Sequence, residues 1–286
     1  MKRTTPKVSV VIPAYNEEEY IAICLDALQA QTSVPLEIIV VDNNSTDKTM
    51  AIVKKYAGVQ ILKEKKQGIV HARNRGFDVA KGEIIARLDA ESKPKADWIE
   101  HIEKVLKTKS IAAVTGPFYY YDMPLSKATI SWRGEWTIRS AVKAMIHNFQ
   151  YLSGANMAIK RSVWEQIRSG LCDDEGYHED IDIALHLTAH GYKIRYDEDM
   201  VVGTSARRID DPPKRFYTYL QRFVRTYREH HLPPAAGYVP VALYMSFYPG
   251  LKLIRFFYDS EKSKFSLDKL KAELERLMSS VNGGKP

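Results

Sequence analysis

The fold is decided by residues 8–28, which read VSVVIPAYNEEEYIAICLDAL. They begin with a short β-branched run that is typical of a buried strand, and they continue through an acidic loop into a helical pattern. The apolar positions of that pattern recur every three or four residues and predict one buried helix face, formed by Ile21, Cys24, Leu25 and Leu28. We expect the glutamates at 17–19 to lie in the first turn of this helix, where the helix dipole favours negative charge.

The same alternation of strand and helix continues to residue 116. Four further apolar runs are short and β-branched, as expected for strands buried on both faces: EIIVVD (37–42), VQILK (59–63), EIIARLD (83–89) and IAAVTG (111–116). Pro94 favours the first turn of another helix. The alternation predicts an α/β fold with a mainly parallel, doubly wound sheet and right-handed crossovers.

Composition is that of an ordinary soluble-type protein. Of the 286 residues, 45% are hydrophobic and 27% are charged, so neither disorder nor a collagen-like structure is expected. Cys24 and Cys172 have no metal-type spacing, which supports neither a disulfide framework nor a zinc site and favours a reducing, cytoplasmic setting. The first apolar run is too short, and too soon followed by acidic residues, for a signal peptide.

The formal net charge is +7, which is compatible with nucleic acid, an anionic membrane or phosphorylated substrates as partners. No recognised nucleic-acid-binding motif accompanies the basic residues, so we do not expect nucleic acid as a partner.

Ligands of such a sheet bind beyond the carboxyl ends of its strands. Polar clusters follow the first, second and fourth predicted strands, and their side chains form one expected rim: Asn16, Asp42, Asp47, Asp89 and Glu91. Each cluster alone is better explained as a loop or a helix cap. Three clusters at the same edge of the sheet indicate a binding site instead.

Asp89 and Glu91 are the members of this rim that suit a cation. Because alternate side chains of an extended segment point the same way, the two carboxylates are expected to converge while Ala90 faces away. The chain has neither a Walker A loop nor a G-x-G-x-x-G motif to hold phosphate. Mg²⁺ or Mn²⁺ on the two carboxylates would bind substrate phosphates instead.

Two features of the second half leave alternatives open. Glu179 and Asp180 lie at the start of a predicted helix that ends at Gly191, where they are either a cap with a first-turn acid or functional groups. The segment 117–152 is rich in aromatic residues, which line a sugar or lipid groove or belong to the core: Tyr119, Tyr120, Tyr121, Trp132, Trp136 and Phe149.

Five segments, taken together in their order and spacing, carry a family resemblance: VSVVIPAYNEEEYIAICLDAL (8–28), IIVVDNNSTDKT (38–49), GIVHARNRGFDVAKGEIIARLDAES (68–92), GANMAIKRSVW (154–164) and GYHEDIDIALHL (176–187). They resemble the inverting GT-A glycosyltransferases of glycosyltransferase family 2. The resemblance covers about residues 7 to 208 and implies a GT-A catalytic domain.

The resemblance implies a donor site for a nucleotide sugar. It places the nucleotide-binding edge at Pro13, Ala14, Tyr15 and Glu17, and it places Asp42 at the position that contacts the base, usually uracil. Arg73 and Asn74 match a segment that packs beside the donor. The resemblance implies that some family members supply a histidine to the metal from the segment that matches TSARR (204–208), but this segment contains no histidine. Arg207 and Arg208 are candidates to face the diphosphate, with surface ion pairing as the alternative.

The resemblance also implies the metal site and the catalytic base. Asp89 and Glu91 match the family's D-x-D motif, whose last carboxylate binds the cation, although a glutamate here replaces the usual aspartate. Asp180, paired with Glu179, falls on the catalytic base. Inverting transfer requires a base to take the proton of the acceptor hydroxyl, and such a base contributes roughly 10²- to 10⁴-fold in rate.

The resulting hypothesis is an inverting, hexosyl-type glycosyltransferase that uses a nucleotide-diphosphate sugar, expected to be a UDP-sugar, and a glycan or lipid-linked acceptor in cell-envelope polysaccharide synthesis. Two alternatives remain. A sugar nucleotidyltransferase needs a basic loop after the first strand, where this chain has the acidic residues 17–19. A non-catalytic nucleotide-sugar-binding scaffold stays open because Glu91 replaces an aspartate.

The C-terminal part, 211–286, is expected to form a helical extension of a catalytic domain at 1–210. Basic residues alternate with aromatics over 214–231, and 232–251 contains no formal charge but four prolines and two glycines, so a single membrane-spanning helix is not expected. We expect either an interfacial element beside a basic helix that faces anionic lipid, or a buried helical hairpin. The first alternative predicts a protein at the cytoplasmic face of the cell membrane.

Overall fold

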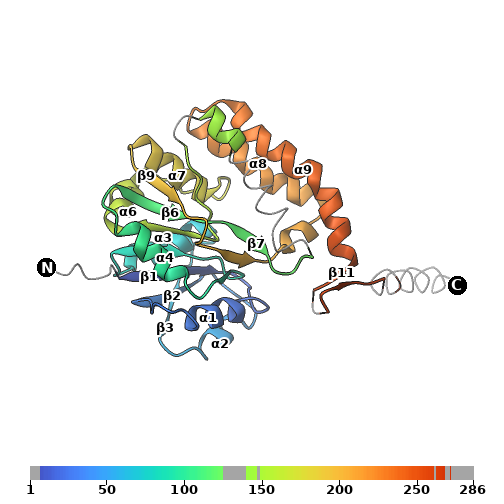
Figure 1. The fold of residues 1–286 in the computed structure, drawn as a ribbon, viewed down its shortest axis with the longest axis horizontal. Helices are drawn as coiled ribbons and strands as arrows, with labels where there is room; N and C mark the ends of the chain where they lie inside the picture. Colours follow the sequence, from blue (N-terminus) through green and yellow to red (C-terminus); the bar gives the residue numbers. More distant parts are fainter. Residues whose placement is uncertain (1–6, 125–139, 147–148, 261, 268–270, 272–286) are drawn as a thin grey trace.

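The computed structural model describes residues 7–124, 140–146, 149–260, 262–267 and 271. Its centre is a seven-stranded sheet in the order β3-β2-β1-β4-β8-β6-β9 (Figure 1). The strands are β1 Val8–Ala14, β2 Glu37–Asp42, β3 Val59–Lys63, β4 Ile84–Arg87, β6 Ile111–Thr115, β8 Met157–Lys160 and β9 Lys193–Tyr196. Only β8 runs antiparallel to its neighbours within this sheet. The predicted α/β fold with a mainly parallel sheet is therefore confirmed.

Helices cover both faces of this sheet: α1 Ile21–Gln29, α2 Thr49–Val53, α3 Ile69–Val79, α4 Trp98–Leu106, α6 Arg161–Ile167 and α7 Glu179–Ala189, with a short 3₁₀ turn at Arg168–Gly170. Val10 and Ile12 of β1 pack with α1 and α4, whereas Val11 between them packs with α3 and α7 on the other face. Alternate side chains of a strand point to opposite faces, which explains why the strands are apolar at nearly every position. The predicted buried face of α1 is confirmed.

The glutamates at 17–19 do not lie in the first turn of α1, as we expected from the sequence. They form the turn before it, in which the carbonyl oxygen of Glu17 accepts hydrogen bonds from the backbone N–H groups of Tyr20 and Ile21. α1 begins at Ile21 and has no acidic residue in its first turn. The glutamate side chains are thus free to reach neighbouring segments: a carboxylate oxygen of Glu18 accepts the backbone N–H of Lys48 at 3.0 Å.

Pro94 is not a helical residue, which corrects a second expectation. It lies in β5 (Lys93–Pro94), which joins β10 (Val202–Thr204) and β7 (Phe118–Tyr120) in a second, three-stranded sheet. α4 starts only at Trp98. Proline tolerates an edge strand because it has no N–H to donate to the ladder, and β5 pairs on one side only, with β10.

The C-terminal part is a helical hairpin of α8 (Pro213–Glu229) and α9 (Pro234–Phe257), which lie side by side (Figure 1). A small hairpin of β11 (Tyr258–Asp259) and β12 (Lys264–Phe265) follows. α9 continues through Pro240 and Pro249, although each internal proline removes a helical hydrogen bond. The prolines therefore do not break this helix, which buries one face against α8.

The hairpin shares one hydrophobic core with α3 and α7, on one face of the large sheet. The buried side chains that it contributes include Phe216, Leu220 and Phe223 from α8 and Ala236, Val241 and Tyr248 from α9. Phe149, from the aromatic-rich segment, packs in the same core at 6.3 Å from the ring of Tyr227. The structure therefore contains a helical hairpin packed on the catalytic part, and a contact of its exposed face with lipid stays a prediction. Trp132 and Trp136 lie outside the described residues, and the division at residue 210 stays a prediction.

No helix of the described residues is both long enough and apolar enough to cross a membrane.

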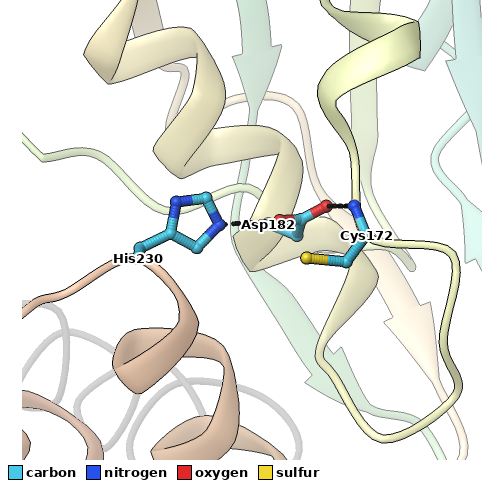
Figure 2. Close-up of side chains that lie close together, drawn as sticks. All are labelled: Cys172, Asp182 and His230. Carbon is cyan, nitrogen blue, oxygen red and sulfur yellow. Dashed lines mark hydrogen bonds and ion pairs between the residues drawn. The ribbon is translucent and has the colours of Figure 1, made fainter.

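A polar cluster connects the end of α8 to α7 (Figure 2). The ring Nε2 of His230 lies 2.7 Å from Oδ1 of Asp182, and the backbone N–H of Cys172 donates to Oδ2 of Asp182 at 2.9 Å. Burial alone would raise the pKa of Asp182, but these hydrogen bonds hold it below its ordinary value. The cluster therefore stabilises the contact between α8 and α7 most strongly above about pH 4, and this contribution is lost in acid as Asp182 protonates.

Gly237 allows the two helices of the hairpin to approach closely. A Cβ at this position would lie 2.7 Å from the Cα of Val224 in α8, whereas a Cβ at Gly250 of the same helix would meet nothing within 4 Å. We expect Gly237→Ala to lower the free energy of unfolding by about 1–3 kcal/mol. Gly250→Ala is the control and should leave it unchanged or raise it by up to about 1 kcal/mol. Urea denaturation measures both, and equal effects would contradict the close packing of α8 on α9.

Candidate active site

The loops after β1 and β2 are hydrogen-bonded to each other. Oδ1 of Asn16 accepts the backbone N–H of Thr46 at 2.8 Å, and Oδ2 of Asp47 accepts the backbone N–H of Glu18 at 3.0 Å. Asn16 has a φ of 55°, a left-handed conformation that asparagine adopts more readily than most residues. These contacts fix the two loops into one rigid rim at the edge of the sheet.

The predicted nucleotide-binding edge is brought together at this rim. Ala14 and Asp42 are register partners at the ends of the parallel strands β1 and β2. Pro13 and Ala14 are buried in β1, whereas Tyr15 is 49% exposed. Asp42 is buried, and its Oδ1 accepts the backbone N–H of Ser45 at 2.9 Å. The roles of these residues toward a nucleotide stay predictions, but their shared location is what the sequence indicated.

Asp89 and Glu91 lie on a turn and not on an extended segment, which corrects the geometry that we expected. The backbone N–H of Ser92 donates to the carbonyl oxygen of Asp89 at 2.9 Å, closing the turn. Even so, the two carboxylates are close: burial first, and then the negative charge of Asp89, raises the pKa of Glu91 to about 7.

Arg207 binds the acidic side of this rim. Its Nη2 lies 2.6 Å from Oε1 of Glu17 and 2.7 Å from Oε2 of Glu91, and its guanidinium carbon lies 4.6 Å from the centroid of the Tyr20 ring. The 3₁₀ turn Arg207–Asp210 that carries this arginine follows β10. Arg207 is thus placed with the predicted metal ligands, as a side chain that partly neutralises them.

The donor set suits a divalent cation. Arg207 pairs with Glu17 and Glu91, and the negative charge of Asp89, which pairs with Arg87, acts on both glutamates. Oε2 of Glu17 is buried and accepts no hydrogen bond from the described residues. Carboxylate oxygens are the ligands that Mg²⁺ and Mn²⁺ prefer. Asp89 and Glu91 would hold such an ion, which would compete with Arg207 for Glu91.

Arg87, at the end of β4, connects Asp89 to the acidic pair on α7. Its Nη2 lies 2.8 Å from Oδ1 of Asp89, and its Nη1 lies 2.5 Å from Oε1 of Glu179. The Arg87–Glu179 pair is shielded from water, with side chains 1% and 8% exposed, whereas the Asp89 side chain is 30% exposed. The sequence reasoning missed this residue. The available signal was an arginine inside an apolar strand, two positions before Asp89 and therefore on the same side of the chain.

Glu179 is held ionised by two arginines. Burial would raise its pKa, but the positive charges of Arg87 and Arg73 lower it to about 2. Arg73 is fully buried and donates to the carbonyl oxygen of Glu179 at 3.1 Å and to the side chain of Asn74 at 2.8 Å. Arg73, held by Asn74, thus stabilises the start of α7. A contact of either residue with the donor stays a prediction.

Asp180 is the carboxylate of the pair that has no ion-pair partner among the described residues. Its Oδ2 accepts the backbone N–H of Gly154 at 2.8 Å, and its Oδ1 accepts the N–H of Ile181 at 2.8 Å. Burial, followed by the charge of Glu179, raises the pKa of Asp180 to about 7. Neighbouring carboxylates whose pKa values are pushed apart take different roles, and the one that titrates near neutral pH suits proton transfer.

Arg208 lies over the ring of Tyr219 in α8, with its guanidinium carbon 4.1 Å from the ring centroid. It lines a groove of about 550 Å³ together with residues of α8. The charge of Glu91 acts on both arginines, and their role toward a diphosphate stays a prediction.

Solved structures share this architecture, which is the GT-A fold of glycosyltransferases. The mannosyltransferase PcManGT from Pyrobaculum calidifontis, in complex with GDP-Man and Mn²⁺, has a TM-score of 0.61 and 24% sequence identity, covering 99% of this chain and 82% of that chain. Glucosyl-3-phosphoglycerate synthase from Mycobacterium tuberculosis, in complex with Mn²⁺, UDP-Glc and phosphoglyceric acid, has a TM-score of 0.61 and 19% identity, covering 80% of this chain and 81% of that chain.

The chain belongs to glycosyl transferase family 2, whose model matches residues 9–168. Among the relatives, glycosyltransferase AglE of Haloferax volcanii is 37% identical over 123 residues, which are 41% of this chain and 40% of that protein. The chain spans less than half the length of each of the first curated relatives that it matches.

Removing Arg87 should destabilise the protein because it leaves Glu179 charged and buried without its strongest partner. We expect Arg87→Met to lower the free energy of unfolding by roughly 3–5 kcal/mol at pH 7. Because the pKa of Glu179 is lowered to about 2 in the folded state, the wild-type pair contributes fully above about pH 4.5 and loses this contribution as the pH falls toward 2, so the deficit should shrink over that range.

The matched control is Lys66→Met, which breaks an ion pair whose side chains are 63% and 58% exposed. It should cost less than about 1 kcal/mol. Urea denaturation at several pH values measures both variants, and a deficit of Arg87→Met that does not change with pH would argue against a charged Glu179.

Proposed function

We propose that this protein is an inverting glycosyltransferase that moves a sugar from a nucleotide-diphosphate donor to an acceptor hydroxyl, with Asp180 as the base. The observation that carries this proposal is that Arg87 pairs both with Glu179, the residue next to Asp180, and with Asp89. This arrangement holds a carboxylate that titrates near neutral pH at a fixed position relative to the carboxylates suited to a cation.

Each group has one task in the proposed reaction. Asp180 accepts the proton of the acceptor hydroxyl as the hydroxyl oxygen attacks the anomeric carbon, and this step contributes roughly 10²- to 10⁴-fold in rate. Glu179 stays ionised against Arg87 and orients the start of α7. A divalent cation on Asp89 and Glu91, when bound, neutralises the leaving diphosphate.

For the donor, we propose a hexosyl UDP-sugar with Mn²⁺ or Mg²⁺. Asp42, at the end of β2, supports a contact with the base, and the rim from Pro13 to Glu17 supports the remaining nucleotide contacts. The fold neighbours include complexes with GDP-Man and with UDP-Glc, each with Mn²⁺. Titration with UDP and with GDP must therefore decide which nucleobase this protein binds.

For the acceptor, we propose a glycan or lipid-linked molecule of the cell envelope, met at the cytoplasmic face of the membrane. Exposed apolar side chains on α9 support a peripheral contact with anionic lipid: Tyr238, Phe247, Leu253 and Phe256. The free thiols of Cys24 and Cys172 support a reducing compartment.

Nucleotide binding is the first test of the donor site. Calorimetric titration with UDP and with GDP, each with and without Mn²⁺, should show metal-dependent binding of UDP. The double variant Asp89→Ala/Glu91→Ala should weaken this binding at least tenfold, which is about 1.4 kcal/mol. Glu100→Ala, an exposed glutamate in the first turn of α4, is the control. If the wild-type protein binds neither nucleotide, the scaffold alternative or an unusual donor replaces the proposal.

Asp180→Asn tests the base. We expect donor affinity within twofold of wild type and transfer reduced roughly 10²- to 10⁴-fold. In wild type, kcat/KM for the acceptor should fall as the pH drops below about 7, because Asp180 must be ionised. Transfer at the wild-type rate would assign the base elsewhere.

The same variant should stabilise the fold at alkaline pH. Because the pKa of Asp180 is raised by folding, its ionisation destabilises the folded state progressively from about pH 4 to 7. Asp180→Asn should therefore raise the free energy of unfolding at pH 8 and have little effect at pH 4, whereas Asp199→Asn should show no such trend. The measurement is urea denaturation across this pH range.

A further inference from the structure

The groove beside the acidic pair is lined mainly by cationic side chains. Its lining residues are Arg208, Asp211, Pro212, Lys214, Arg215, Thr218, Tyr219 and Arg222. The residues from α8 recur every three or four positions, so they lie along one face of that helix. Asp211 is the single acid of the lining, and its Oδ1 pairs with Nε of Arg215 at 3.4 Å. Among the described residues, Arg208, Lys214 and Arg222 have no ion-pair partner.

Two of these unpaired cations share one aromatic ring. The guanidinium carbons of Arg208 and Arg222 lie 4.1 Å and 5.6 Å from the centroid of the Tyr219 ring. A ring face attracts each guanidinium by about 0.5–2 kcal/mol, but like charges held beside the same ring repel one another. An anion bound between them would remove this repulsion. Arginine is also the side chain whose planar fork best matches the oxygens of a phosphate.

Both acidic parts of the active site act on side chains that line the groove. The ring of His178, the residue before Glu179, lies 5.0 Å from the Tyr219 ring. The negative charges of Asp180 and Glu179 are close enough to raise the pKa of Tyr219, after the larger effect of burial. On the other side, the charges of Glu91 and Asp89 act on Arg208. Tyr219 and Arg208 therefore connect the groove electrostatically to the two acidic parts of the active site.

We propose that the groove lined by Arg208, Lys214 and Arg222 binds a phosphate group of the acceptor, so that a hydroxyl of the same molecule faces Asp180. The inference rests on the proposed function for the meaning of "acceptor", but the phosphate site itself follows from the side chains of the groove. The phosphate is distinct from the diphosphate of the donor, which faces the carboxylates at the rim.

The test compares Lys214→Gln/Arg222→Gln with Arg228→Gln, an exposed arginine of α8 outside the groove. Inorganic phosphate is titrated into the free protein and into protein saturated with Mg²⁺ and the nucleotide that binds. We expect phosphate to bind both forms of wild type and of Arg228→Gln with equal affinity. The double variant should bind it at least tenfold more weakly while keeping its nucleotide affinity.

Two results would overturn the proposal: equal phosphate affinity in the double variant and wild type, or phosphate binding that nucleotide abolishes, which would assign the groove to the donor. Absence of nucleotide binding would instead contradict the proposed function. Phosphate titration of the free protein would still test whether the groove binds phosphate. Circular dichroism confirms that both variants fold.

Sedimentation with vesicles distinguishes two sources of the phosphate. Binding to phosphatidic acid vesicles, but not to phosphatidylcholine vesicles, that is lost in the double variant indicates a lipid phosphate. If the double variant loses only inorganic phosphate binding, a soluble phosphate ester is indicated.

Discussion

The buried contact of Arg87 with Glu179 is the interaction on which the rest of the site depends. One guanidinium, 1% exposed, bonds to Glu179 at 2.5 Å and to Asp89 at 2.8 Å, so that β4 and the start of α7 hold each other in place. A buried arginine is tolerated only because carboxylates compensate its charge. The same compensation keeps Glu179 ionised and leaves the neighbouring Asp180 as the carboxylate with a raised pKa.

A second charge balance operates at the rim of the sheet. Glu17 and Glu91 come from segments after β1 and β4, and Arg207 from the turn after β10 bonds to both. In other family members, the resemblance suggests, this segment supplies a histidine to the metal. Here a permanent cation takes a place among the carboxylates, so binding of a divalent ion and the position of Arg207 are expected to depend on each other.

The C-terminal hairpin completes the site as well as the core. Its apolar side chains share a core with the helices on one face of the sheet. One face of α8 then presents Lys214, Tyr219 and Arg222 to the groove beside Asp180. Because the groove needs residues from both the turn after β10 and α8, any motion of the hairpin would change the surroundings of the acidic pair.

The sequence by itself determined strands β1 to β4 and β6, the buried face of α1, the helix that starts at Glu179 and the gathering of the rim, because these follow from local periodicity and from the way parallel strands end at one edge. It misplaced Pro94 and the glutamates at 17–19, where tertiary contacts override local preference. Only the tertiary structure decided the partners of Arg87, the pairing of Arg207 with Glu17 and Glu91, and the raised pKa of Asp180. These depend on distance and burial between residues far apart in the chain, which spacing along the sequence does not contain.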